Sequence, residues 1–280
     1  MLSFGMRCHD ICPKMPMEAL FEEVRANGID QIQLAFGKSI SDYDFSPGHY
    51  SAGFAHYIDR LLKKNGIHVA VLGCYINPIN PIESKRQAEV AKFIEHLKYA
   101  KIIGADMVGT ETGRLSPDMK VTPETFTETA YQRLLKSMRE IVPAAEKLGV
   151  TVGVEGVFDH TLYSPAMMQR FLEDIDSPNV EVILDSVNLI HPEEVSCQAE
   201  VIDQAFDYYG DKITMLHMKD FVFDGNNQIF RHVGEGLFQY EPLMKRLKEA
   251  KPHITMLLEN SNKERYHSDV EFLKEAYNRV

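Results

Sequence analysis

The stretch "VEVILDSVN", residues 180–188, is an apolar run that ends in a carboxylate. Its density of Val, Ile and Leu predicts a short strand buried on both faces, which is typical of parallel sheets covered by helices. A buried strand that ends in Asp185 delivers a charged group to one edge of such a sheet. The question is whether other strands of the chain do the same.

Seven further short apolar runs alternate with longer amphipathic stretches. They are rich in β-branched or large apolar residues and too short for helices, which predicts strands. These predicted strands are "LSFGMRC" (2–8), "IDQIQLAF" (29–36), "IHVAVLGCYI" (67–76), "ADMVGTETG" (105–113), "VTVGVEGV" (150–157), "ITMLHMKD" (213–220) and "HITMLLEN" (253–260). With residues 180–188 they make eight.

Helical patterns occupy much of the chain between these runs. Apolar residues at helical spacing predict helices over residues 17–27, 83–104, 123–149, 201–210, 238–250 and 268–280. Gly28, Gly104 and Gly149 each stand between a helix and the next strand, as at left-handed helix ends that lead into parallel strands.

Eight strands alternating with helices in 280 residues predict a closed (β/α)₈ TIM barrel, an α/β fold forming a single domain over residues 1–280. A doubly wound open sheet is the alternative. The usual nucleotide signatures of open sheets are missing, because no GxGxxG follows the first strand and no GxxxxGK[ST] occurs.

The composition restricts the partners. A net charge of −11 repels phosphate backbones and anionic lipid headgroups, so neither nucleic acid nor a membrane surface is an expected partner. The sequence has four cysteines without a CxxC pair, no N-terminal signal pattern and no run of 18 apolar residues. Together these features predict a cytoplasmic protein with reduced thiols. A homo-oligomer is compatible with the sequence.

Four of the predicted strands carry a potential metal ligand at or near the end. These residues are Glu155, Asp185, His217 and Glu259, spaced by 30, 32 and 42 residues. One strand–helix unit takes about 30 residues or more, so the four fall one per consecutive strand. In a parallel barrel the chemistry sits at the carboxyl ends of the strands, where all four would meet.

Three carboxylates in a low-dielectric cavity raise each other's pKa, and a bound divalent cation removes that conflict. Three oxygen donors and one imidazole predict Mn²⁺, with Mg²⁺ or Co²⁺ as alternatives. Zn²⁺ is less favoured because it prefers more His or Cys ligands. Any one of these carboxylates could instead cap a helix or pair with a basic side chain. Four at matching positions favour the metal hypothesis.

The same residues carry a family resemblance that covers essentially the whole chain. They are "VEG" at Glu155, "LDSVN" at Asp185, "LHMKD" at His217 and "LLEN" at Glu259, together with "NPINP" after the third strand and "GEG" at residues 234–236. In this ordered set the chain resembles the xylose isomerase-like TIM-barrel superfamily. Its members include ketose 3-epimerases, inosose isomerases and inosose dehydratases.

The resemblance implies a metal-dependent isomerase or epimerase that acts on a keto-sugar, a sugar phosphate or a related polyol through a cis-enediolate. It assigns Glu155 and Glu259 as metal ligands that also move protons. One glutamate would remove the proton beside the carbonyl and the other would return a proton to the opposite face. Return of the proton to the neighbouring carbon would give aldose–ketose isomerisation.

Three positions depart from the epimerase pattern. Asn188 stands where a histidine is usual, Thr161 where a second glutamate is frequent, and Phe223 where an arginine is frequent. A simple ketohexose 3-epimerase is therefore less favoured than an enzyme acting on another polyol or keto-sugar. A metal-dependent dehydratase or lyase acting on an inosose-like keto-polyol is the alternative. It needs an acid that Asn188 cannot supply, and neither His9 nor His160 is secured for that role by a motif.

Other residues are expected to contact the carbohydrate substrate. Lys219 shares the face of His217, where it would stabilise an enediolate oxygen or pair with a carboxylate. The full set of predicted substrate-binding residues is His9, Glu111, Asn188, Lys219 and Arg231.

Two other function classes remain open. An abasic-site endonuclease would need a basic groove and a richer histidine cluster, which the charge of −11 argues against. A non-catalytic accessory subunit would not need the four ligands.

Overall fold

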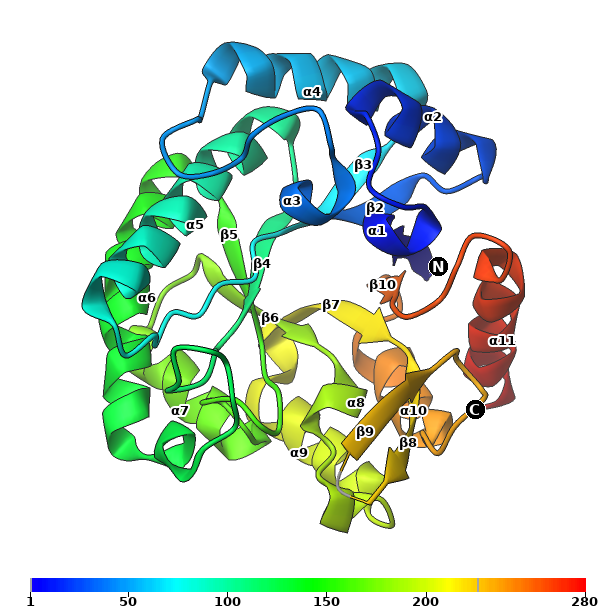
Figure 1. Cartoon of the computed structure of the whole chain (residues 1–280). Helices are drawn as coiled ribbons and strands as arrows, with labels where there is room; N and C mark the ends of the chain where they lie inside the picture. The colour runs from blue at the N-terminus through cyan, green and yellow to red at the C-terminus, as the bar shows by residue number, and fades with distance from the viewer. Residues whose placement is uncertain (1, 226) are drawn as a thin grey trace.

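Eight parallel strands form a closed barrel in the computed structural model, which describes residues 2–225 and 227–280 (Figure 1). β1 pairs with β10 on one side and with β2 on the other, so the ring has no open edge. The predicted TIM barrel is confirmed and the open sheet is excluded. The barrel strands are β1 (Ser3–Arg7), β2 (Gln31–Leu34), β3 (His68–Gly73), β4 (Met107–Glu111), β5 (Thr151–Glu155), β6 (Val180–Leu184), β7 (Ile213–Met218) and β10 (Thr255–Leu258).

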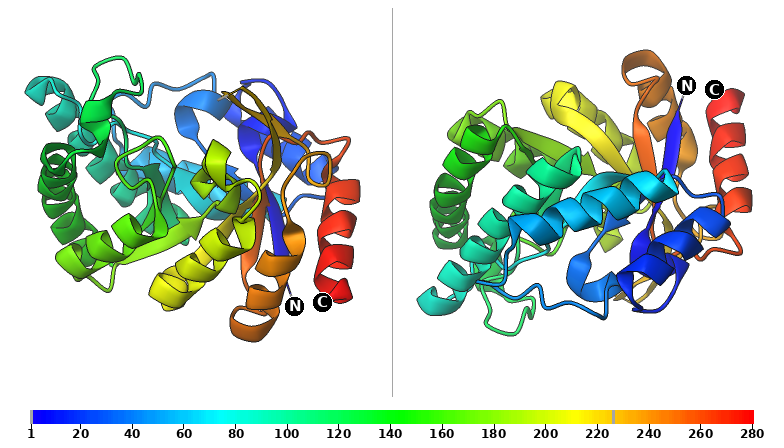
Figure 2. Two further views of the ribbon diagram at one scale, coloured as in Figure 1. Left: turned by 90° about the horizontal axis from the view of Figure 1, so that it is seen from below. Right: turned by 90° about the horizontal axis from the view of Figure 1, so that it is seen from above.

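Helices surround the barrel on its outside, as the two side views show (Figure 2). Ser51, Thr127 and Ser164 each accept a hydrogen bond from the backbone at a helix start. The outer helices are α2 (Met17–Ala26), α4 (Ala52–Asn65), α5 (Glu83–Ile103), α6 (Glu128–Leu148), α7 (Pro165–Ile175), α9 (Gln198–Tyr209), α10 (Tyr240–Ala250) and α11 (Tyr266–Arg279).

The sequence patterns miss two of these helices, α4 and α7, and the helix expected over 123–149 is divided. A 3₁₀ turn, η1 (Pro123–Phe126), comes first, and α6 begins only after Thr127. Short helical turns also follow three strands directly, namely α1 (Cys8–Ile11), α3 (Phe36–Ser39) and α8 (Ser186–Leu189). Two further 3₁₀ turns, η2 (Pro192–Glu194) and η3 (Gly210–Lys212), flank α9. None of the helices in the described part of the chain is long and apolar enough to span a membrane.

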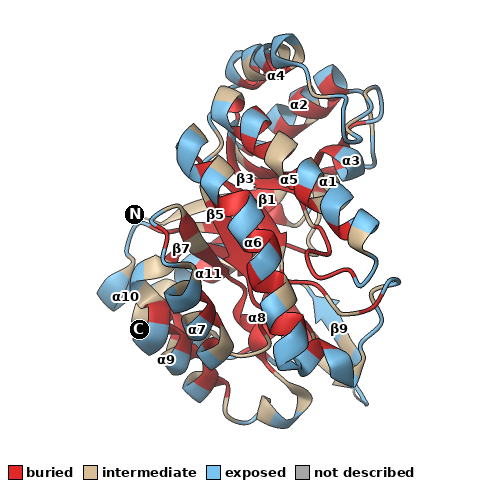
Figure 3. Cartoon of the chain, turned by 90° about the vertical axis from the view of Figure 1, so that its left-hand side faces the viewer, coloured by how far each residue is buried: buried red, intermediate tan, exposed pale blue. Residues whose placement is uncertain are grey.

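The barrel interior is a packed apolar floor rather than a channel, and the buried strands stand at the centre of the molecule (Figure 3). Gly109 and Gly153 make room for Ile183, because a Cβ on either glycine would lie 2.9 Å from the Cδ1 atom of Ile183. The residues of this floor are Ala70, Val71, Met107, Ile183, Met215 and Leu257.

Filling this floor should destabilise the barrel. In Gly109→Ala the new methyl would also meet the branched Val71 side chain at 2.7 Å, so the free energy of unfolding should fall by about 1–3 kcal/mol. Gly37→Ala is the control, because nothing lies within 4 Å of its Cβ position. Urea unfolding of both variants measures the difference. Equal stability of the two variants would contradict this account of the floor.

A two-stranded antiparallel hairpin, β8 (Asp220–Asp224) and β9 (Asn227–Arg231), follows β7, and within residues 2–225 and 227–280 its strands pair only with each other. The pattern of apolar runs does not predict it. The hairpin stands apart from the ring of barrel strands (Figure 1), and β9 is largely exposed (Figure 3). It is therefore an insertion between a barrel strand and its helix, at the end of the barrel where the strands finish.

Candidate metal centre

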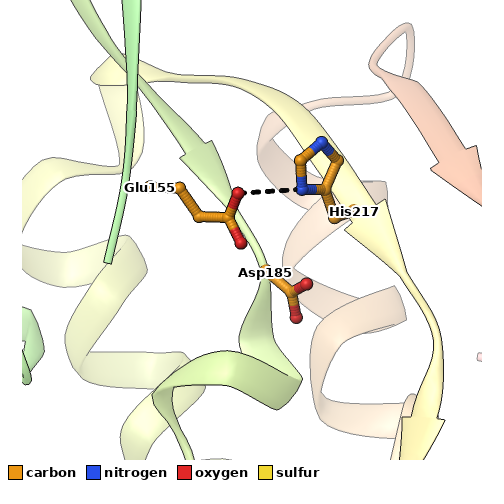
Figure 4. Close-up of side chains that lie close together, drawn as sticks. All are labelled: Glu155, Asp185 and His217. Carbon is orange, nitrogen blue, oxygen red and sulfur yellow. Dashed lines mark ion pairs between the residues drawn. The ribbon is translucent and has the colours of Figure 1, made fainter. Parts of the chain in front are cut away.

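Three predicted ligands from neighbouring strands meet at the carboxyl end of the barrel (Figure 4). Glu155 is the last residue of β5, Asp185 directly follows β6, and His217 lies near the end of β7. One ligand atom from each lies within 4.8 Å of the others, and all three residues are buried. This spacing follows from the parallel register, which brings successive strand ends to one side.

Asp185 makes two different contacts with its two oxygens. Oδ1 accepts a hydrogen bond of 3.0 Å from the backbone N–H of Asn188 and thereby caps α8. Oδ2 lies 2.5 Å from Nζ of Lys219. The helix-cap role and the metal-ligand role are therefore compatible, because capping occupies only one of the two oxygens.

Asn188 also fixes the orientation of Glu155. Its side-chain amide donates a hydrogen bond of 2.6 Å to Oε1 of Glu155. The other oxygen, Oε2, lies 3.1 Å from Nδ1 of His217. The residue that departs from the epimerase pattern thus contacts a candidate metal ligand.

Glu259, the fourth predicted ligand, lies beside the group but contacts mainly cations. It follows β10, and its Oε2 lies 3.0 Å from Nζ of Lys219 and 3.4 Å from Nη1 of Arg7. Its Oε1 lies 3.4 Å from Nδ1 of His217. Glu259 is thus adjacent to the three converging ligands, with Lys219 between it and Asp185.

The buried charges shift one another's protonation. Burial would lower the pKa of His217, but Glu259 and Glu155 outweigh it and raise that pKa to about 9. Burial would raise the pKa of Glu259, but Lys219 and His217 outweigh it and lower that pKa. Burial also raises the pKa of Asp185, to about 6, against the opposing effect of Lys219. His217 and Lys219 therefore offset part of the negative charge of the three carboxylates.

The donor set suits a divalent cation. Nδ1 of His217 faces the carboxylates of Glu155 and Glu259, whereas its Nε2 is buried and has no hydrogen-bond partner among the described residues, which is unusual for a buried polar atom. An imidazole beside two buried carboxylates is a donor set that Mn²⁺, Mg²⁺, Co²⁺ and Zn²⁺ all accept. The buried triad of Glu155, Asp185 and His217 could thus bind a metal ion, whose identity the geometry leaves open.

A cavity of about 670 Å³ opens beside these ligands, a volume within the range of small-molecule sites. Four of the five predicted substrate-binding residues line it, namely His9, Glu111, Asn188 and Lys219. Arg231 lies outside the lining. It is exposed on β9, and its guanidinium donates to the carbonyl of Phe230.

Other residues of the cavity were not found from the sequence. Gln33 on β2 donates a hydrogen bond of 2.6 Å to the hydroxyl of Tyr75, and both line the cavity. The hairpin adds Gln228, which donates to the carbonyl of Val187, and Phe230, whose ring centroid lies 4.4 Å from Nζ of Lys219. Gln33 could have been found from the sequence, because it is a polar residue at a position of an apolar strand that is expected to be buried.

The sequence model of the xylose isomerase-like TIM barrel matches residues 21–276. The chain belongs to this family. A curated relative in sequence is an inosose dehydratase of Histophilus somni (strain 129Pt), 24% identical over 144 residues. That match covers 50% of this chain and 47% of the relative, so the chain spans about half the length of the curated relative it matches.

Solved structures of other proteins share the xylose isomerase-like fold over nearly the whole chain. A D-tagatose 3-epimerase-like protein superposes with a TM-score of 0.75 at 19% identity, covering 99% of this chain and 98% of that one. The IOLI protein, solved with a binding zinc atom, has a TM-score of 0.74 at 16% identity and covers 98% and 96%. At these identities the likeness shows the fold.

Proposed function

We propose that the chain is a divalent-metal-dependent isomerase or epimerase of a keto-sugar, sugar phosphate or related polyol. The observation that carries the proposal is the buried group of Glu155, Asp185 and His217 beside a polar cavity, with Glu259 next to it. Glu259, Asn188 and Lys219, which contact these buried ligands, line the cavity, and a polar cavity of this size suits a small polyhydroxylated molecule.

The proposed ligands of the ion are Glu155, Asp185, His217 and Glu259, and Mn²⁺ is the expected ion. When bound, it would polarise the substrate carbonyl and stabilise the negative charge of a cis-enediolate.

The proton transfers are assigned to the two glutamates. Asn188 holds one oxygen of Glu155, while Lys219 and Arg7 hold one oxygen of Glu259. The second oxygen of each carboxylate, which lies beside Nδ1 of His217, is the atom that would take or return a proton next to the substrate carbonyl. The ammonium of Lys219, which lines the cavity, would stabilise an oxyanion of the substrate.

A dehydratase acting on an inosose-like keto-polyol is the second candidate. The observation that favours it is the sequence match to an inosose dehydratase. Both candidates begin by removing a proton next to a carbonyl. They differ in whether a proton returns to carbon or a hydroxyl leaves.

Incubation of the Mn²⁺-loaded protein with a panel of keto-sugars in D₂O tests the proposal. We expect at least one sugar to take up deuterium at the carbon next to its carbonyl, with no loss of water, because the proton removed exchanges with solvent before it returns. NMR locates the deuterium and mass spectrometry shows whether water is kept. No uptake from any keto-sugar or inosose would contradict the proposal, and a product lighter by one water would favour the dehydratase.

A further inference from the structure

A second cavity of about 490 Å³ opens beside the first. Its walls come mainly from the ends of β2 and β3, from α3, from the loop between α3 and α4, and from α5. Lys38 and Tyr75 line both cavities, so the second adjoins the first at the carboxyl end of the barrel. Its volume is that of a small-molecule site, and the proposed function leaves it without an occupant.

Three lysines from three separate segments line this second cavity. Lys14 lies between α1 and α2, Lys38 on α3 and Lys92 on α5. Within residues 2–225 and 227–280, none of their ammonium groups forms a hydrogen bond or an ion pair. The chain as a whole has a net charge of −11, so three unpaired cations around one cavity reverse the sign of the charge locally.

The carboxylates near this cavity leave the three lysines free. Asp44 is the single acidic residue among the described residues that line it. Its Oδ2 lies 2.7 Å from Nδ1 of His49, and its Oδ1 accepts a hydrogen bond of 2.9 Å from the backbone N–H of Ser46. Glu89, three residues before Lys92 on α5, lies outside the lining and beyond ion-pair distance of that lysine. The ammonium groups therefore keep their charge and their donors for a ligand.

The loop between α3 and α4, which forms one wall of the cavity, is tied to both of the helices beside it. The backbone N–H of Gly48 donates a hydrogen bond of 2.9 Å to Oε1 of Glu95 on α5. The ring of Phe45 stacks on that of Phe36 from α3, with ring centroids 4.2 Å apart. A wall that is already ordered lowers the entropy cost of binding a ligand.

We propose that the second cavity binds the phosphate group of the substrate, which makes that substrate a phosphorylated keto-sugar or keto-polyol. The inference rests on the proposed function for the reaction at the carbonyl, and it adds the group that selects the substrate. A phosphate presents oxygens in several directions, which suits single ammonium groups that come from separate elements. A planar carboxylate favours the paired donors of an arginine, and no arginine is among the described residues that line this cavity.

The two cavities then recognise two ends of one molecule. The carbonyl end lies in the first cavity, which Glu259 and Lys219 line, and the phosphate lies in the second. The ammonium of Lys38, 5.6 Å from the centroid of the Tyr75 ring, stands at the boundary. The other two lysines line only the second cavity. Changing either of those two should therefore weaken recognition of the phosphate and leave recognition of the neutral end unchanged.

Calorimetric titration of the Mn²⁺-loaded full chain with glucitol 6-phosphate and with glucitol tests this site without turnover, because neither polyol has a carbonyl. We expect the wild type to bind the phosphate at least about 10-fold more tightly than glucitol. Lys14→Gln and Lys92→Gln should each weaken binding of the phosphate by about 10-fold or more, the usual cost of a lost hydrogen bond between charged groups. Lys101→Gln, which removes an exposed lysine that lies in the last turn of α5 and lines neither cavity, is the matched control.

Three results of the titration would overturn the inference. Glucitol and its phosphate would bind equally to the wild type if the cavity did not recognise the charge. Both lysine variants would bind the phosphate like the wild type if it lay at the ion or outside the cavity. Gluconate would bind as tightly as glucitol 6-phosphate if the site were built for a carboxylate.

Deuterium exchange in D₂O separates this inference from the proposed function. The wild type should exchange a ketohexose 6-phosphate with a lower KM than the ketohexose itself, and Lys92→Gln should raise only the KM of the phosphate. Exchange with equal KM values for the two sugars would overturn the inference and leave the proposed function intact. Binding of glucitol 6-phosphate through the lysines, with no exchange into any keto-sugar or its phosphate, would overturn the proposed function and leave the phosphate site.

Discussion

Glu155→Gln and Glu259→Gln should each lower deuterium exchange into a keto-sugar substrate by about 100-fold to 10,000-fold, even with saturating Mn²⁺. The amide keeps the shape and one oxygen of the side chain, but it cannot take a proton from carbon. In Glu155→Gln the hydrogen bond from Asn188 can persist, because the amide oxygen can still accept it. The comparison therefore separates proton transfer from side-chain placement.

Single-turnover exchange rates at several Mn²⁺ concentrations give the measurement. Glu173→Gln is the matched control, since it removes an exposed carboxylate from the last turn of the outer helix α7 and lines no part of the cavity. If either site variant exchanges at the wild-type rate under saturating metal, that glutamate is not a proton carrier. A rate that recovers as Mn²⁺ rises would assign the residue to metal binding alone.

The purified chain should hold about one divalent ion, and Asp185→Asn should weaken that binding by at least about 100-fold. Changing a residue that only supports a metal ligand commonly costs 10- to 100-fold in affinity, and a direct ligand should cost no less. Removal of the ion by a chelator should abolish exchange, and added Mn²⁺ should restore it. Elemental analysis gives the stoichiometry, and calorimetric titration of the metal-free protein gives the affinity.

Glu173→Gln again serves as the control and should bind the ion like the wild type. A chain that holds no metal and binds none after Mn²⁺ addition would contradict the assignment. Wild-type affinity in Asp185→Asn would remove that residue from the ligand set. In that case the contacts of Asp185 with the N–H of Asn188 and with Lys219 would be its whole role.

The sequence predicts the barrel well because the pattern of one apolar run followed by one amphipathic stretch is local and is repeated along the chain. Each buried strand is an apolar run, and the strand ends must face one way once all strands are parallel. That argument alone places Glu155, Asp185 and His217 together, which the structure shows. It places Glu259 only at the same rim. Its pairing with Lys219 depends on side-chain rotamers, which a strand pattern does not encode.

The hairpin of β8 and β9 is not predicted by the alternation of strands and helices, for a different reason. Asp224-Gly225 between two alternating apolar stretches is a hairpin signal, and Gly225 has the positive φ of 58° that such turns favour. The eight longer apolar runs already supply the eight strands of the barrel. Two extra strands between β7 and its helix do not fit a pattern in which strands and helices strictly alternate. The hydrogen bond from the hydroxyl of Thr161 to the carbonyl of Gly113 could not be predicted from the sequence either. It joins two loops at positions that are 48 residues apart along the chain.

The separate pairing of β8 with β9 has an evolutionary consequence. In the described residues β8 and β9 pair with each other and with no barrel strand, so the backbone ladder of the barrel does not include them. Yet Gln228 and Phe230 reach the cavity from β9. Descendants of this chain could therefore change the exposed strand β9, and with it the molecule that the cavity accepts, while the barrel strands and the buried group of Glu155, Asp185 and His217 stay the same.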